Sequence, residues 1–107
     1  MMTTAEKIAY VQAFADDPEA TDALVRAYLL KAAGAVFARM YGIGGKPSNV
    51  TEVPERYELI QCELALRYFM RRGGEGEKAH NENGINRQYG SVNDEDLLME
   101  VVQVIRL

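Results

Sequence analysis

The sequence has no tryptophan, one cysteine, one histidine and three prolines among 107 residues. A single cysteine, Cys62, cannot form an internal disulfide, so the chain does not belong to the disulfide-stabilised secreted domains. The only histidine, His80, has no second histidine or cysteine near it, which leaves no zinc-ligand pattern. Without tryptophan, the core has to be built mostly from aliphatic side chains.

Long apolar runs are also missing, because no stretch approaches the roughly 20 residues that a membrane-spanning helix needs. Residues 1–7 lack the basic start and apolar middle of a signal peptide. We therefore expect a protein made and kept in a reducing cytoplasm, without membrane contact. The net charge of −4 opposes binding to nucleic-acid phosphates.

The length suits one domain, residues 1–107, with a single modest core. Thr3 and Glu6 have the spacing of a capping box, and the apolar residues behind them recur at helical intervals. This pattern predicts a first helix from about residue 4 to 15. Residues 16–18, Asp-Asp-Pro, end it because proline disfavours helical geometry in the residue before it.

A second helix is predicted to begin at residue 19 or 22 and to end at Tyr41, before Gly42. Its few polar side chains point in scattered directions. We therefore expect a central helix that neighbours enclose on more than one side. Small residues at 32–35 would allow another backbone to approach closely there.

Pro54 suits the first turn of a third helix, which should continue to about Arg72. Its apolar residues form two sets about half a turn apart. One set contains Leu59, Cys62, Leu66 and Phe69, flanked by Met70, and the other contains Tyr57, Leu64 and Tyr68. Two interpretations stay open. Either both sets are internal to the bundle, or Tyr57, Leu64 and Tyr68 lie in or near an oligomer interface, where aromatic residues are enriched.

Residues 73–91 are polar and rich in glycine and asparagine, and a loop of this length is either disordered or functional. The acidic run at 94–96 suits the start of a last helix, predicted from 94 to about 102, and is better explained by helix capping than by metal binding. The β-branched residues that follow predict an extended tail. The expected fold is all-α, a small bundle of about four helices with a long polar loop before the last helix.

No arrangement of a nucleophile with a base is visible, so we predict that the chain is not an enzyme and has no cofactor or metal. Cys62 lies inside an apolar helical stripe and is predicted to be a core residue. Gly44-Gly45-Lys46 resembles the end of a phosphate-binding loop, but Met40 and Pro47 occupy positions where that loop needs glycine and serine or threonine.

Residues 71–98 resemble the signature region of head-tail connector proteins from long-tailed bacteriophages. An Arg-Gly-x-Glu-Gly element begins at Arg72, and a Glu-Asn-Gly-Ile-x-Arg-x-Tyr element occupies 82–89. Ser-Val at 91–92 and a Leu-Leu pair at 97–98 follow in the same order. The upstream helices are similar in length and character. The chain departs from the family pattern at 79–81, where Ser-His-Ser is common, and near its end, where it has Gln103 and family members often have proline.

The resemblance implies a structural virion protein that assembles as a ring of about twelve copies at the head-tail junction. The ring would join the portal protein to a tail-side connector or stopper protein and extend the DNA channel. A virion protein of this kind would be made in the host cytoplasm.

In this interpretation the polar stretch is an arm that orders on the portal or on a neighbouring copy. Ile85 and Tyr89 would be its apolar anchors and Arg87 its polar one. The alternative for this stretch is a surface loop without a role.

The competing hypothesis for the whole chain is a small helical DNA-binding or regulatory domain. Against it, Arg71-Arg72 is the only adjacent basic pair, and no helix is basic along one face.

Overall fold

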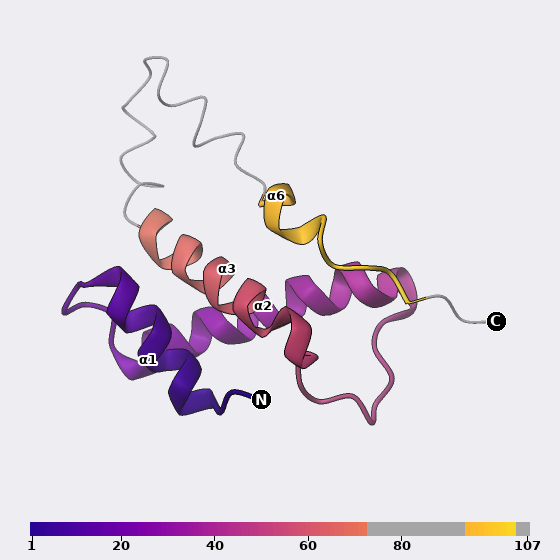
Figure 1. The fold of residues 1–107 in the computed structure, drawn as a ribbon, viewed down its shortest axis with the longest axis horizontal. Coiled ribbons are helices and arrows are strands. Elements are labelled where there is room, and N and C mark those ends of the chain that lie inside the picture. Colours follow the sequence, from indigo (N-terminus) through magenta and orange to yellow (C-terminus); the bar gives the residue numbers. More distant parts are fainter. Residues whose placement is uncertain (73–93, 105–107) are drawn as a thin grey trace, which may run out of the picture.

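The computed structural model of the chain describes residues 1–72 and 94–104, and these ranges contain helices and no strands. Three helices form the body: α1 (Thr4–Ala15), α2 (Asp22–Tyr41) and α3 (Glu58–Arg71). A short helix, α6 (Glu95–Leu98), follows. The long helix α2 runs along the molecule, and α1 and α3 pack against it and against each other (Figure 1). The predicted all-α bundle is confirmed.

Local signals set the ends of α1 and α2 as predicted. The Thr3 hydroxyl accepts a hydrogen bond from the Glu6 amide at 3.1 Å, and the Glu6 carboxylate accepts one from the Thr3 amide at 2.7 Å. Thr21 caps α2 by accepting from the Leu24 amide at 3.3 Å, so the later of the two predicted starts is correct. Gly42 ends the helix with a φ of 65°, a conformation that glycine adopts without strain.

The core forms where α1 and α3 cover one side of α2. The buried residues of α2 recur at helical spacing, and they are Val25, Leu29, Ala32, Val36 and Met40. The expected enclosure on more than one side is not found. The opposite side of α2 is exposed, and Leu30 there is 75% exposed. In the described part of the chain nothing lies within 4 Å of a Cβ built on Gly34, so no other backbone approaches closely at this glycine.

A 3₁₀ turn, η2 (Glu55–Tyr57), precedes α3, so the α-helix begins four residues after Pro54. Cys62, Leu64 and Phe69 are almost fully buried between α3 and its neighbours. The prediction that Cys62 is a core residue is confirmed. None of the described helices is long and apolar enough to cross a bilayer.

The last helix is shorter than predicted, because it ends at Leu98 rather than near residue 102. Beyond it the backbone amides find partners elsewhere in the fold. The Val102 amide donates to the Tyr57 hydroxyl at 2.9 Å, and the Val104 amide donates to the Met40 carbonyl at 2.7 Å. Val101 is buried at the same point. These contacts favour the extended tail, which is confirmed as far as residue 104.

Candidate assembly surfaces

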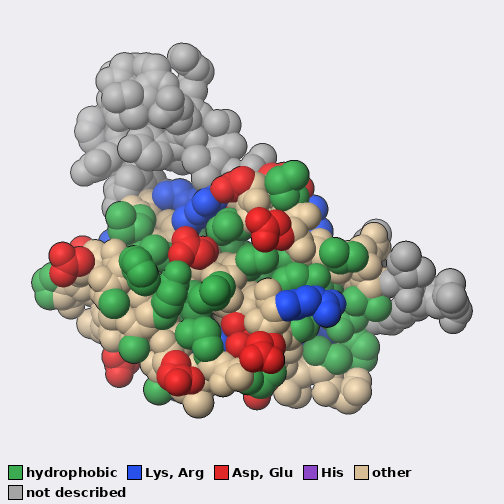
Figure 2. Space-filling view, viewed as in Figure 1, with side chains coloured by type: hydrophobic (Ala, Val, Ile, Leu, Met, Phe, Trp, Pro, Cys, Tyr) green, Lys and Arg blue, Asp and Glu red, His purple; other side chains and the backbone are tan. Residues whose placement is uncertain are grey.

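The outer face of α3 leaves large apolar side chains in solvent. Leu59 is 57% exposed, Met70 is 61% exposed, and Leu66 between them is partly exposed. At 100° per residue these three side chains point in nearly the same direction, away from the core. Figure 2 shows hydrophobic side chains gathered on the side of the molecule that carries α1 and α3. We call Leu59, Leu66 and Met70 the α3 outer face.

The structure places the predicted interface residues Tyr57, in η2, and Leu64 and Tyr68, in α3, differently from one another. Tyr57 and Leu64 are 4% and 0% exposed, so a single chain already covers them. The interpretation that keeps both apolar sets internal describes these two residues better. Tyr68 alone is partly exposed. The Tyr57 hydroxyl binds the tail by accepting the hydrogen bond from the Val102 amide, and this hydrogen bond lowers the pKa of Tyr57.

Tyr68 stands beside a small cationic hollow at the end of α3. The hollow has a volume of about 160 Å³ and is lined by Tyr28, Lys31, Tyr68, Arg71 and Arg72. The Lys31 ammonium lies 4.6 Å from the centre of the Tyr68 ring. Burial raises the pKa of the Tyr68 hydroxyl. In this hollow the Tyr68 ring therefore packs against the Lys31 ammonium in a cation–π contact.

Arginines of α3 hold the segment that begins at Asp94. Arg71 Nη2 lies 2.7 and 2.8 Å from the two Asp94 carboxylate oxygens. Arg67 donates to both Asp96 oxygens, at 2.8 and 2.7 Å, and also to Asp94 at 3.2 Å. The hydrogen bond from Arg67 lowers the pKa of Asp96. Similarly, the hydrogen bond from Arg39 lowers the pKa of Glu95.

Glu95 and Asp96 lie in the first turn of α6, as predicted for the acidic run, but Asp94 has a different role. The Asp94 side chain makes no capping hydrogen bond to α6, and its backbone is left-handed with a φ of 57°. Its carboxylate instead binds two arginines of α3. At the other flank of the polar stretch, Arg72 pairs with Glu19 in the turn between α1 and α2. Arg72 and Asp94, the described residues on either side of residues 73–93, are therefore both tied to the helical body.

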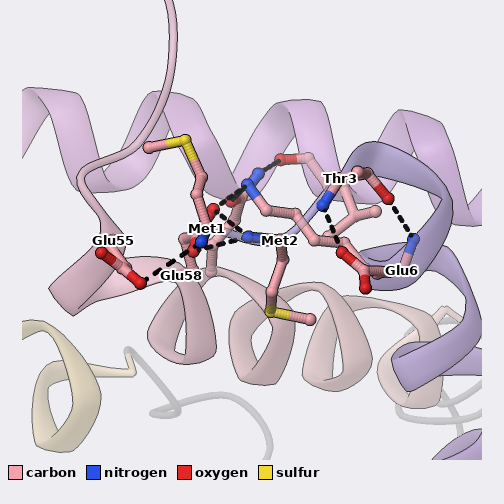
Figure 3. Close-up of polar contacts among 9 residues, drawn as sticks. Met1, Met2, Thr3, Glu6, Glu55 and Glu58 are labelled. Carbon is pink, nitrogen blue, oxygen red and sulfur yellow. Dashed lines mark hydrogen bonds and ion pairs between the residues drawn. The ribbon is translucent and has the colours of Figure 1, made fainter.

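A groove of about 710 Å³ lies beside the exposed side of α2. Leu29, Leu30 and Ala33 line it from α2, with Met1 and Met2 from the N-terminal segment and Val53 from the connection before α3. Polar groups at its base are paired (Figure 3). Lys7 Nζ donates to Gln61 Oε1 at 2.6 Å, and the Met2 amide donates to the Glu58 carboxylate at 3.1 Å.

Three predicted site residues, Ile85, Arg87 and Tyr89, lie outside the described residues, as does His80. Within residues 1–72 and 94–104 no group of three or more histidine, cysteine, aspartate or glutamate side chains could hold a metal ion. Burial raises the pKa of the Cys62 thiol to about 11, which keeps it protonated and unreactive near neutral pH. In the described ranges the most prominent surface features are the exposed apolar side chains Leu30, Leu59 and Met70.

Comparison with known proteins agrees with this description. No curated protein and no solved structure gives a significant match. A family model described as "Phage gp6-like head-tail connector protein" matches residues 15–99. The match spans α2, α3, the polar stretch and α6, and so covers most of the chain. The resemblance seen in residues 71–98 is thereby confirmed, and the chain belongs to the phage gp6-like head-tail connector protein family.

Proposed function

We propose that this connector protein forms a homo-oligomeric ring of about twelve copies at the head-tail junction, between the portal and a tail-side connector or stopper protein. The observation that carries the ring is the exposure of large apolar side chains on two different helices, with Leu30 on α2 and Leu59 and Met70 on α3. A ring with heterologous contacts covers two different surfaces on every copy, whereas a twofold dimer covers one.

The charge of the chain favours a role in lining a DNA channel rather than a role in binding DNA. The net charge is −4, and Arg67, Arg71 and Arg72 all form ion pairs with carboxylates of the same chain. Carboxylates of the chain therefore neutralise these three arginines, which leaves them without free charge for phosphates. A lining of this kind lets DNA pass without holding it, as an extension of the DNA channel requires.

Residues 73–93 form an arm in this proposal, with Ile85 and Tyr89 as apolar anchors and Arg87 as a polar one on the portal or a neighbouring copy. The ion pairs of Arg71 with Asp94 and of Arg72 with Glu19 support it, because they fix both flanks of the stretch. An arm with a fixed base presents its anchors from a defined place on the ring.

Light scattering and negative-stain electron microscopy at high protein concentration, with and without purified portal, test the ring. We expect rings alone or on the portal. A chain that stays monomeric, ignores portal and shifts duplex DNA in a gel would contradict the proposal and favour the DNA-binding alternative.

The arm is tested by complementing a phage that lacks this gene. Ile85→Asp or Tyr89→Asp should leave the helical content unchanged and block the joining of heads to tails. Gln88→Asp is the matched control, because it adds the same charge to the same element without removing an apolar anchor. Normal joining by the Ile85 and Tyr89 variants would refute the arm.

A further inference from the structure

We propose that the α3 outer face of one copy packs into the groove beside the exposed side of α2 of the next copy. The inference rests on the proposed ring and identifies the two surfaces that meet in it. The exposed side of α2 is the second surface, and its residues are Ala23, Ala27, Leu30, Gly34 and Ala38. We call it the α2 open face.

The two faces are complementary in size. The α3 outer face carries long side chains, Leu59, Leu66 and Met70, whereas the α2 open face is built mainly from alanine and glycine. The axes of two packed helices lie 8–10 Å apart, at a distance set by how the side chains at the contact interdigitate. Gly34 has no heavy atom of the described chain within 4 Å of its Cβ position, so space for a neighbour is open there. The groove beside Leu30 and Ala33 adds room for the longer side chains.

The lengths of the faces also agree. Leu59 and Met70 are eleven residues apart, or about 16 Å along the helix axis at 1.5 Å per residue. Ala23 and Ala38 are fifteen residues apart, or about 22 Å. The whole α3 outer face therefore fits within the length of the α2 open face.

Charge favours the same pairing. Arg26 and Lys31 border the α2 open face, and within the part of the chain that the structure describes neither forms an ion pair with a carboxylate. Glu63 lies on the α3 outer side between Leu59 and Leu66. It accepts a hydrogen bond from the Tyr10 hydroxyl at 2.7 Å and raises the pKa of that tyrosine to about 12. In the proposed contact the basic border of the α2 open face thus meets the acidic Glu63 of α3, and this complementary charge steers the two faces together.

The position of the faces determines the kind of assembly. The α2 open face is opposite the side of α2 that packs on α1 and α3, and the α3 outer face points away from α2. Two faces on opposite sides of one molecule cannot satisfy each other within a closed pair. Each copy therefore leaves one face for the next copy, and such head-to-tail contacts close as a ring when the rotation from copy to copy divides a full turn.

Gly34→Leu tests the α2 open face. The added side chain meets open space in the single chain and replaces glycine by a better helix former, so the monomer should fold at least as well as the wild type. It should nevertheless abolish ring formation in sedimentation velocity. Ala13→Leu, at an exposed alanine of α1, is the matched control and should form normal rings.

Leu59→Lys/Met70→Lys tests the other face and should also sediment as a monomer, because it places two charges on the apolar contact. A mixture of this variant with Gly34→Leu should give a one-to-one dimer and no ring, since each variant keeps one intact face. This result is specific for two different faces.

The outcomes separate this inference from the proposed ring. Wild-type rings together with Gly34→Leu rings would overturn the assigned faces and leave the ring intact. Variants that still form rings but lose binding to portal would also overturn it, because the face would then belong to portal. A wild type that forms no ring alone or on portal would overturn both proposals.

Discussion

Lys7 of α1 and Glu58 of α3 form an ion pair of 3.5 Å that a single chain buries, with side chains 10% and 3% exposed. The Met2 amide donates to the same carboxylate (Figure 3). A buried ion pair adds little net stability compared with an apolar pair, but removing one partner leaves an uncompensated charge. The pair therefore fixes how α1 sits on α3, at the base of the groove beside α2.

Lys7→Met should lower the free energy of unfolding by about 3 kcal/mol, since it leaves the Glu58 carboxylate buried without its cation. Urea denaturation followed by circular dichroism measures the change. The double variant Lys7→Met/Glu58→Gln should recover most of the loss, because the unpaired charge is gone. Equal losses in the single and double variants would show that packing of the lysine stem, rather than charge, is responsible.

Asp94→Asn should cost about 2 kcal/mol of stability, because two arginines lose hydrogen bonds to a charged acceptor. Asparagine tolerates the left-handed backbone at this position, so strain does not contribute. Asp16→Asn is the matched control: Asp16 is the other left-handed aspartate and forms no ion pair in the described structure. Similar losses at both positions would exclude the arginine pairing as the cause.

The helix ends could be predicted from sequence because they depend on neighbouring residues. Thr3 with Glu6 and Gly42 after Tyr41 carry their signal within a few positions. The end of α6 could not, since it depends on contacts of the tail with Tyr57 and Met40, far away along the chain. The β-branched residues after it predicted an extended tail but did not indicate where the helix ends and the tail begins.

The exposed apolar faces were harder to predict than the helices. The apolar residues of α3 cover most of its circumference, so spacing alone could not show that Tyr57 and Leu64 face inward while Leu59 and Met70 face solvent. On α2 the alanines are distributed around the helix, and only the placement of α1 and α3 decides which of them are exposed. The residue types indicated that the chain has more apolar surface than its core can bury, but they did not show where that surface lies.

Acid should release α6 before the three-helix body unfolds. The pKa values of Glu95 and Asp96 lie below their ordinary values of 4.5 and 3.8 because Arg39 and Arg67 bind the charged forms. Lowered pKa values mean that the stabilisation is present above the ordinary values and is lost as the pH falls through the lower, folded-state values.

NMR of leucine methyl groups follows this transition. The Leu97 and Leu98 signals should shift below about pH 4, while the Leu64 signal in the core should stay unchanged. A single transition shared by all three signals would show that the ion pairs do not hold α6 separately.

Cys62 should react with a thiol reagent at pH 8 only when the chain unfolds. The side chain is 0% exposed, so the reagent cannot reach it, and burial raises the pKa of the thiol to about 11, so little of the reactive thiolate is present. The labelling rate should therefore follow the unfolding equilibrium as urea is added, and a fast reaction of the native protein would contradict the described core. Lys7→Met should accelerate labelling in proportion to its loss of stability.

Tyr57→Phe distinguishes a core role of Tyr57 from an interface role. The change removes the hydroxyl that accepts from the Val102 amide, so it should cost about 1 kcal/mol in the monomer and increase hydrogen exchange of the tail amides. Tyr68→Phe is the control, because the Tyr68 hydroxyl has no hydrogen bond in the described structure, and it should change neither quantity. Rings should form with both variants. A Tyr57→Phe monomer of unchanged stability that no longer assembles would instead place this hydroxyl in the contact between copies.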